Sequence, residues 1–347
     1  MDNRVLLGAL SVGQTLPDDP RNGLARTGRG RLTRLALVLT ALVALVVVGV
    51  VTVYVWPLRS DGLQRATPET LSFESASARA ARAVIAEAAD TEVLPECRSQ
   101  FLSHQRVSAK AVLLLHGDTD CPRQYRSLAK LFFDRGYNVW VPRAPGRGVA
   151  DRSAHAKLNA DELVSSANDA LNVAAGLGDT VGVVGISGGG VLATWLVGHR
   201  PDVVHRALLL SPLYKPNPAR VPDLVVKPFA VLFGFGFVPD RVDGEGLSSA
   251  AMSQYLRIVG NFTIDPKSPH LRELAIVTSA NDDFIDLRAA ADIPRAIADL
   301  NDTSFTAHEW PRESGIGHDV LDPEGLRGRA DEINQYYLDL YEGNEWA

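Results

Sequence analysis

The stretch TVGVVGISGGGVLATWLVG at residues 180–198 constrains the fold of this chain most strongly. Apolar, β-branched residues run directly into Gly185-Ile186-Ser187-Gly188-Gly189, and a helical pattern follows. This is the only G-x-S-x-G in the chain, and a strand–turn–helix junction is the context that a nucleophile elbow requires. Such a turn is strained, so glycines supply backbone freedom and leave the hydroxyl uncrowded. The alternative is a serine in an ordinary Ser-Gly turn.

Strand-like and helix-like patterns alternate through residues 96–347, and this alternation sets the expected architecture. Short runs rich in β-branched residues are separated by segments with apolar residues at helical spacing. The pattern predicts an α/β fold with a mostly parallel central sheet and helices on both faces. Strands are expected near residues 110–117, 137–143, 180–187, 204–212, 273–283 and 303–311, and helices near residues 122–136, 160–178, 189–198, 287–300 and 323–342.

The residues that follow the expected strands form a candidate site. In open parallel sheets, ligands bind beyond the carboxyl ends of the strands. In chain order, the polar residues at these ends are His116-Gly117-Asp118, Ser187, Asp282-Asp283 and His318. The order serine, acid, histidine is that of α/β-hydrolase triads and differs from the two other common triad orders. This order favours a nucleophilic role for Ser187.

Five segments carry a resemblance to a known family. From about Cys97 onward the chain resembles the α/β-hydrolase family, and it is most similar to bacterial serine esterases and lipases with an H-G-x-T-x-C-P loop. The resemblance implies an α/β-hydrolase domain over residues 96–347 and a carboxylesterase or lipase-like serine hydrolase. It implies little about the substrate, because this fold hosts many chemistries. The segments are LLLHGDTDCP (113–122), YNVWVPRAPGRG (137–148), VVGISGGG (183–190), TSANDDFID (278–286) and GIGHDVLDP (315–323).

The expected catalytic triad combines Ser187, His318 and a carboxylate after the fifth expected strand. Ser187 is the expected nucleophile, and His318 is the base that takes its proton and returns it to the leaving group. Alignment on the family's G-x-x-D-x-x-V pattern selects Asp282, although Ser and Ile stand where Gly and Val are usual. Asp283 is the first alternative for the acid, and Asp286 is the second.

Two main-chain N–H groups are expected to form an oxyanion hole. One belongs to Gly188, which follows the nucleophile, and the other to Asp118, in the loop after the first buried strand. Relatives often carry an aromatic or aliphatic residue at position 118. Since a carboxylate facing the developing oxyanion would be unfavourable, we expect the Asp118 side chain to point away. Arg147 stands where relatives often have His, and it is expected to be a solvated charge, with a substrate clamp as the alternative.

Residues 212–265 occupy the usual position of a cap. They include the apolar piece DLVVKPFAVLFGFGFVP, which is interrupted by Gly and Pro. We expect a lid that lines an acyl pocket. The alternatives are ordinary core packing and a surface that dips into a bilayer.

Residues 35–58 contain an uncharged apolar run that is long enough to cross a bilayer as a helix. The run ends with Tyr54 and Trp56, where an aromatic belt is expected. A buried core helix and a cleaved signal peptide are the alternatives. The sequence therefore predicts one transmembrane helix over residues 35–58, after a basic tail over 1–34 and before a linker with one short helix over 59–95.

The arginines around the apolar run predict its orientation. By the positive-inside rule, the basic tail is cytoplasmic and the catalytic domain lies outside the cytoplasm. Two arginines, Arg59 and Arg65, follow the run and are diluted by Asp61 and Glu69. A cluster of five directly precedes it, at Arg21, Arg26, Arg29, Arg31 and Arg34.

Cys97 and Cys121 are expected to form a disulfide. The family resemblance covers the loop through Cys121, Cys97 lies at a plausible distance before it, and both fall on the proposed outer side, where disulfides persist. Two independent thiols are the alternative. Two cysteines have no zinc-site spacing, and neither a metal nor an organic cofactor is expected.

Composition and motifs together narrow the function. A net charge of −6 argues against a nucleic-acid binder, which needs a dominant basic face. The sequence predicts a membrane-anchored serine hydrolase that cleaves carboxylic esters through an acyl-serine intermediate, with a small ester or lipid-like acyl substrate. The alternatives are an amide or thioester hydrolase or an acyltransferase on the same triad, and a catalytically silent, membrane-tethered binding module.

Overall fold

The computed structural model describes residues 21–151, 154, 157–243, 246–263, 267–321, 326 and 328–344, with side chains from residue 33 onward. The chain divides into two compact units, Met1–Val55 and Trp56–Ala347. Residues 1–20 of the expected basic tail lie outside the described residues. So do residues 322–325 and 327, at the start of the expected closing helix.

The first unit contains the helix α1 (Arg21–Val55). Its segment Thr33–Val55 contains an 18-residue window with a mean hydropathy of 2.9 and has the length and composition of a membrane span, criteria that a signal sequence also meets. The helix ends at Val55 rather than at residue 58, so the predicted boundary is too long. Pro57 explains the difference, because a proline disfavours helical backbone at the residue before it.

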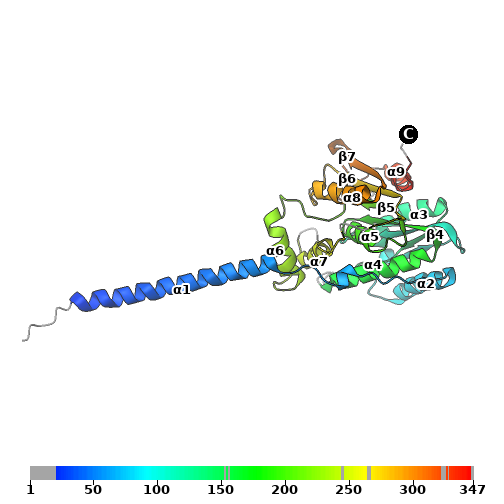
Figure 1. Cartoon of the computed structure of the whole chain (residues 1–347). Helices are drawn as coiled ribbons and strands as arrows, with labels where there is room; N and C mark the ends of the chain where they lie inside the picture. Colours follow the sequence, from blue (N-terminus) through cyan, green and yellow to red (C-terminus); the bar gives the residue numbers. More distant parts are fainter. Residues whose placement is uncertain are drawn as a thin grey trace, which may run out of the picture. The chain divides into compact units, whose positions relative to one another are not determined.

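The second unit is built on a seven-stranded sheet in the order β1-β3-β2-β4-β5-β6-β7 (Figure 1). The short edge strand β1, which the sequence analysis did not predict, runs antiparallel to β3, and the other neighbours pair in parallel. The predicted mostly parallel sheet is therefore confirmed. The strands are β1 (Gln100–Leu102), β2 (Ser108–Leu115), β3 (Tyr137–Val141), β4 (Gly178–Ile186), β5 (Val204–Leu210), β6 (Glu273–Ser279) and β7 (Ser304–Trp310).

Helices cover both faces of this sheet. Alternate residues of β2 enter two separate cores: Leu113 packs with the helices of one face and Val112 with those of the other. The first core includes α4 (Ala160–Ala175), α5 (Gly188–His199) and α8 (Leu287–Asn301), and the second includes α3 (Arg126–Asp134) and α9 (Ala330–Glu342). Short 3-10 turns complete the loops: η1 (Gly62–Gln64), η2 (Pro95–Cys97), η3 (Pro122–Tyr125) and η5 (Arg312–Ser314).

Two helices lie between β5 and β6, within the expected cap at 212–265. They are α6 (Asp223–Gly234) and α7 (Ser249–Val259), which pack against each other. Helix α7 also contacts α5, the helix that follows the nucleophile elbow. This contact brings the cap to the carboxyl end of the sheet.

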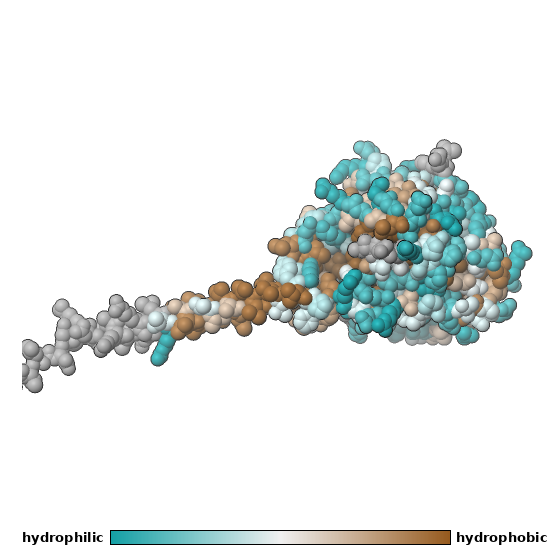
Figure 2. Space-filling model, viewed as in Figure 1, coloured by the Kyte–Doolittle hydropathy of each residue, from teal (hydrophilic) through white to brown (hydrophobic). Residues whose placement is uncertain are grey.

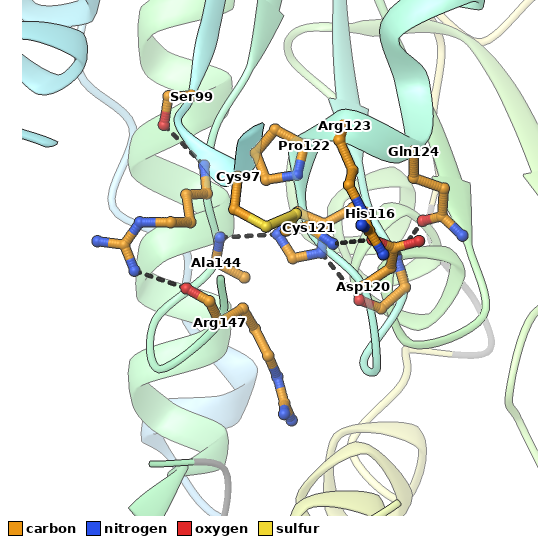
Figure 3. The surroundings of a disulfide bond; sticks show 12 residues. Cys97, Ser99, His116, Asp120, Cys121, Pro122, Arg123, Gln124, Ala144 and Arg147 are labelled. Atoms are coloured by element: carbon orange, nitrogen blue, oxygen red, sulfur yellow. Dashed lines mark hydrogen bonds and ion pairs between the residues drawn. A yellow bond between two sulfur atoms is a disulfide. The ribbon is translucent and has the colours of Figure 1, made fainter. Parts of the chain in front are cut away.

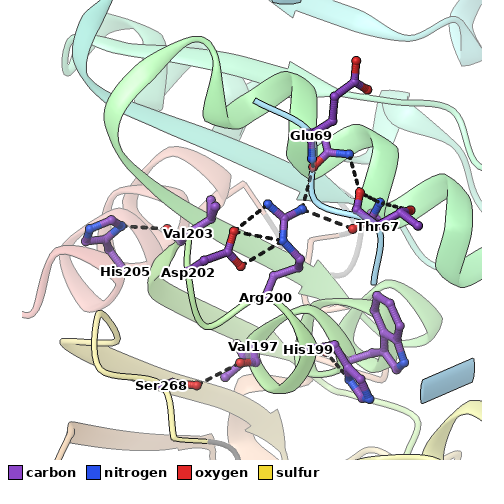
Figure 4. A network of polar contacts seen from close by, with 12 residues as sticks. Thr67, Glu69, Val197, His199, Arg200, Asp202, Val203, His205 and Ser268 are labelled. Carbon is purple, nitrogen blue, oxygen red and sulfur yellow. Dashed lines mark hydrogen bonds and ion pairs between the residues drawn. The ribbon is translucent and has the colours of Figure 1, made fainter. Parts of the chain in front are cut away.

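The segment 59–95 packs on the domain, so its interpretation as a linker is wrong. Its helix α2 (Phe73–Ala89) lies alongside α4 (Figure 1). Ala76 and Ala80, one helical turn apart, are fully buried. The chain before α2 is held by a polar network around the buried Arg200, which bonds Asp202, while neighbouring amides bond the Thr67 carbonyl (Figure 4). A stripe of alanines lets α2 approach α4 closely, which a helix in a free linker does not need.

Candidate active site

Ser187 lies at the junction of β4 and α5 with a strained backbone. Its φ of 53° and ψ of −115° fall in a region that non-glycine residues seldom adopt. Its own N–H bonds the Leu210 carbonyl at 2.9 Å, which fixes the turn to β5. A side chain at Gly189 would collide with the Leu115 carbonyl oxygen, and one at Gly185 would collide with the Gly189 carbonyl. The glycines therefore allow the close backbone approach that holds Ser187 in this conformation.

Ser187, His318 and Asp282 form a continuous hydrogen-bonded chain. The Ser187 Oγ lies 2.9 Å from His318 Nε2, and His318 Nδ1 lies 2.7 Å from Asp282 Oδ2. The Asp282 side chain is fully buried, and its Oδ1 accepts the N–H groups of Phe284 and Ile285. These bonds fix the carboxylate, which in turn orients the imidazole toward Ser187.

The two alternative acids have other partners. The Asp283 side chain is 79% exposed and pairs with Arg220. Asp286 caps the start of α8 and pairs with Lys215. Among the three candidates from the sequence, the structure places Asp282 against His318.

Two main-chain N–H groups beside Ser187 are candidate oxyanion donors. Gly188 is the first residue of α5, so its N–H has no acceptor within the helix. Among the described residues, the Asp118 N–H has no hydrogen-bond acceptor. The Asp118 side chain is buried and forms an ion pair with Arg147, so its charge is compensated by a cation.

Arg147 is buried rather than solvated, so the sequence expectation for this residue is wrong. Its side chain is 1% exposed, and the Asp118 carboxylate is its ion-pair partner. A buried charge needs a partner of opposite sign. Arg143 reinforces the same loop by donating to the Arg147 carbonyl at 2.8 Å.

Tyr255 of α7 is a site residue that the sequence analysis missed. A Cβ added to Gly188 would lie 2.7 Å from its ring, so the tyrosine packs directly on the residue after Ser187. Burial, together with the nearby Asp118 carboxylate, raises the pKa of Tyr255 well above its usual range. Through Tyr255, a neutral phenol, helix α7 therefore contacts both Gly188 and Asp118.

The loop after β2 is held by the buried His116. Its Nδ1 donates to the Gly117 carbonyl at 2.8 Å, and its Nε2 accepts the Ala144 N–H at 2.9 Å (Figure 3). Both bonds suit a neutral imidazole, and burial lowers the pKa of His116 to about 4.

Gln124 connects this loop to the loop of His318. Its Oε1 accepts the Gly117 N–H at 2.9 Å, and its Nε2 donates to Asp319 Oδ2 at 2.8 Å. Asp319, next to His318 in sequence, is partly buried, and burial raises its pKa. The Gln124 amide therefore connects the two loops by hydrogen bonds. No short sequence motif predicts this connection.

A disulfide joins Cys97 and Cys121, the pair that the sequence analysis expects to be bonded (Figure 3). Their Cα atoms are 5.1 Å apart. The bond ties η2, at the entrance to the sheet, to the start of η3. Cys121 is three residues from Asp118, so the disulfide restrains the loop that carries the Asp118 N–H.

A cavity of about 270 Å³ opens over Ser187 and His318. Phe284 forms one side of it, with its ring centre 4.8 Å from that of His318. The Arg220 guanidinium lies over the Phe284 ring, 5.3 Å from its centre. Both apolar and polar groups line the opening, and the remaining lining residues are Asp118, Thr119, Leu213, Leu247 and Asp283.

Comparison with known proteins gives one family and one curated relative. Residues 110–237 match the family model described as alpha/beta hydrolase fold. A stretch of 92 residues is 33% identical to a thermostable monoacylglycerol lipase of Bacillus sp. (strain H-257). This alignment covers 26% of the chain and 36% of the lipase, so the chain spans about a third of that relative's length.

Solved structures resemble the second unit over most of its length. A structure described as the metagenome-derived lipolytic enzymes LipS and LipT matches with a TM-score of 0.55 and 19% identity, over 73% of this chain and 100% of that one. A Paleococcus ferrophilus monoacylglycerol lipase matches with a TM-score of 0.51 and 14% identity, over 70% of this chain and 98% of the other. At such identities the likeness concerns the fold, and the predicted α/β-hydrolase fold is confirmed.

Proposed function

Because this chain has the α/β-hydrolase fold and resembles esterases and lipases, we propose that it is a serine hydrolase that cleaves carboxylic esters through an acyl-serine intermediate. The observation that carries the proposal is the hydrogen-bonded chain from Ser187 through His318 to Asp282. A silent binding fold has no need for a strained serine in contact with an imidazole and a buried carboxylate.

In the first half of the reaction, Ser187 attacks the ester carbonyl. His318 Nε2, 2.9 Å from the Ser187 Oγ, takes the hydroxyl proton and then delivers it to the departing alcohol. Asp282 holds the Nδ1–H tautomer of His318 and stabilises the imidazolium. The ester C–O bond breaks, and the acyl group remains on Ser187.

The negative charge that develops on the carbonyl oxygen falls between the N–H groups of Gly188 and Asp118. Donors that are in place before the reaction stabilise this charge without a reorganisation cost. The Arg147 guanidinium forms an ion pair with the Asp118 carboxylate. This ion pair compensates the negative charge of the Asp118 side chain. In the second half, His318 activates water, which attacks the acyl carbonyl and releases the acid and Ser187.

We propose a lipid-like acyl ester as the substrate class. The apolar Leu213, Leu247 and Phe284 line the cavity beside Ser187. The curated relative is named a monoacylglycerol lipase, which is consistent with this class. We also propose that residues 212–265 act as a lid, since Leu213 and Leu247 both come from this segment.

We further propose that α1 anchors the protein in a membrane, with residues 1–34 in the cytoplasm and the domain outside it. The support is the uncharged span up to Val55 and the arginines that precede it. Protease added to intact spheroplasts should cut the domain or the segment after Val55. Cleavage only after lysis would show that the domain lies in the cytoplasm, opposite to the proposed orientation.

The proposed reaction is tested with the full chain in detergent and short-chain aryl esters. Ser187→Ala should lose turnover by about a million-fold, to background, because a triad serine has no substitute in the site. The variant's circular dichroism and thermal midpoint control for folding. Retention of more than about a tenth of the wild-type rate, a loss far smaller than a missing triad serine causes, would remove Ser187 from the mechanism.

A further inference from the structure

Exposed apolar side chains are concentrated on the cap. In the described part of the second unit, nine large apolar residues are exposed, and five of them fall within residues 224–242. The other four, Ile85, Leu94, Val107 and Leu300, are spread over the rest of the domain. Figure 2 shows a hydrophobic surface over the part of the domain where Figure 1 labels α6. We call the five residues the cap face: Leu224, Val225, Phe235, Phe237 and Val242.

Trp56 connects the cap face to the point where the chain leaves the apolar span. Its ring packs edge-on against Phe237 at 5.2 Å and against Phe235 at 5.9 Å. Trp56 directly follows Val55, the last residue of the span. Tryptophan at the end of a membrane span lies at the level of the lipid head groups. Wherever Trp56 enters the interface, the two phenylalanines therefore enter it as well.

The chain after Trp56 is hydrogen-bonded to the rest of the domain and is not a flexible linker. Asn261 bonds the main chain on both sides of Arg59, at the Leu58 carbonyl and the Ser60 N–H, and the Trp195 indole N–H donates to the Leu63 carbonyl at 2.7 Å. The Leu63 side chain is fully buried. These bonds fix the domain relative to the residue that follows the span.

We propose that the cap face docks into the outer leaflet of the bilayer that α1 crosses. The proposal rests on the membrane anchor proposed above and adds a second membrane contact to it. The occupant is lipid because the cap face is continuous with an interfacial tryptophan and is held there by the fastened segment 58–63. Apolar surface at this depth is transferred from water to acyl chains, which is favourable. The cap beside the catalytic cavity then lies at the lipid surface, where acyl esters are concentrated.

Spin labels on the full chain test this docking without any need for activity. Leu224→Cys and Val242→Cys place labels on the cap face, at side chains that are 75% and 62% exposed. Ile85→Cys and Leu300→Cys are matched controls, because these apolar residues are 68% and 53% exposed elsewhere on the domain. Each variant is labelled without reductant, to keep the Cys97–Cys121 bond, and is reconstituted in phosphatidylcholine–phosphatidylglycerol nanodiscs.

Collisions of each label with oxygen, which partitions into lipid, and with a water-soluble nickel chelate report its environment. The cap-face labels should show a ratio of oxygen to nickel collisions several-fold above that of the two controls. Equal ratios at all four sites would overturn the docking. Dipolar broadening between cap-face labels, with nickel access unchanged, would instead identify a second copy as the occupant and also overturn it. Failure of ester hydrolysis would remove the proposed function and leave this result intact.

Discussion

Asp118 and Arg147, which are 29 residues apart in the chain, form an ion pair in which the two side chains are 3% and 1% exposed. The N–H of Asp118 is one of the two proposed oxyanion donors, so the ion pair lies in the loop that carries this donor. Tyr255 closes the same region from the cap. The position of this proposed oxyanion donor therefore depends on a buried charge pair.

We expect Arg147→Met to destabilise the fold by about 3–5 kcal/mol, because it leaves the Asp118 carboxylate buried without a partner. Asp118→Leu should be destabilising in the same way. The double variant Asp118→Leu/Arg147→Met should recover most of the loss, since a buried pair replaced by apolar residues is often neutral. Thermal unfolding of the four proteins in one detergent measures this coupling. Additive losses in the double variant would mean that the two charges do not compensate each other.

The adjacent carboxylates Asp282 and Asp283 provide a matched pair of substitutions. Asp282→Asn should lower kcat for aryl esters by about four orders of magnitude, because the amide would hold the wrong tautomer of His318. Asp283→Asn should have a far smaller effect, since Asp283 is exposed and pairs with Arg220. Steady-state kinetics of both variants decide the acid. A reversed ranking would assign the role to Asp283.

Reduction of the Cys97–Cys121 bond should affect both stability and catalysis. The bond closes a loop of about 25 residues, which contributes roughly 3 kcal/mol in the chain-entropy model. It also restrains the Asp118 loop, so kcat for esters should fall at temperatures where the fold persists. Kinetics and thermal midpoints with and without reductant separate the two effects. An unchanged kcat would limit the bond to a structural role.

His116 should make the protein less stable in acid. Above about pH 6.5 the imidazole is neutral in both the native and the unfolded chain, so it adds no pH dependence. As the pH falls from 6.5 toward 4, the His116 imidazole becomes protonated in the unfolded chain but stays neutral in the native state, because burial lowers the pKa of His116 to about 4. The free energy of unfolding should therefore fall by about 3 kcal/mol over this range and level off below it.

The non-titrating variant His116→Asn provides the control. It should be less stable than the wild type at pH 7.5, and its stability should decline less steeply between pH 6.5 and 4. Unfolding free energies at several pH values give both slopes. Equal slopes would show that His116 is not the titrating group.

Much of the fold could be predicted because its signals are local. The alternation of β-branched runs and helical patterns over residues 96–347 indicated the parallel sheet. The rule that parallel strands share one carboxyl edge then predicted that Ser187, Asp282 and His318 lie together. The choice between Asp282 and Asp283 rested on the family pattern, because two adjacent carboxylates in a turn look alike in a sequence. Which of these two carboxylates faces His318 depends on the backbone conformation after β6.

The rest required tertiary contacts. Arg147 looks like a loop charge in the sequence, since the partner that permits its burial is distant in the chain. Residues 59–95 are rich in alanine and charge and look like a linker, yet Ala76, Ala80 and Leu63 are buried against partners beyond residue 160. Gln124 and Tyr255 act through loops and helices that meet only in the folded domain.

The central claim is that Ser187 is an activated nucleophile, and its covalent labelling by a fluorophosphonate tests this most directly. The full chain is treated with the reagent in detergent, digested and analysed by peptide mass spectrometry, beside Ser187→Ala and Asp283→Asn. The account predicts one adduct on the peptide that contains Ser187, its loss in Ser187→Ala and its retention in Asp283→Asn. Absence of an adduct on Ser187 in the folded wild-type protein, or equal labelling of Ser187→Ala, would contradict it.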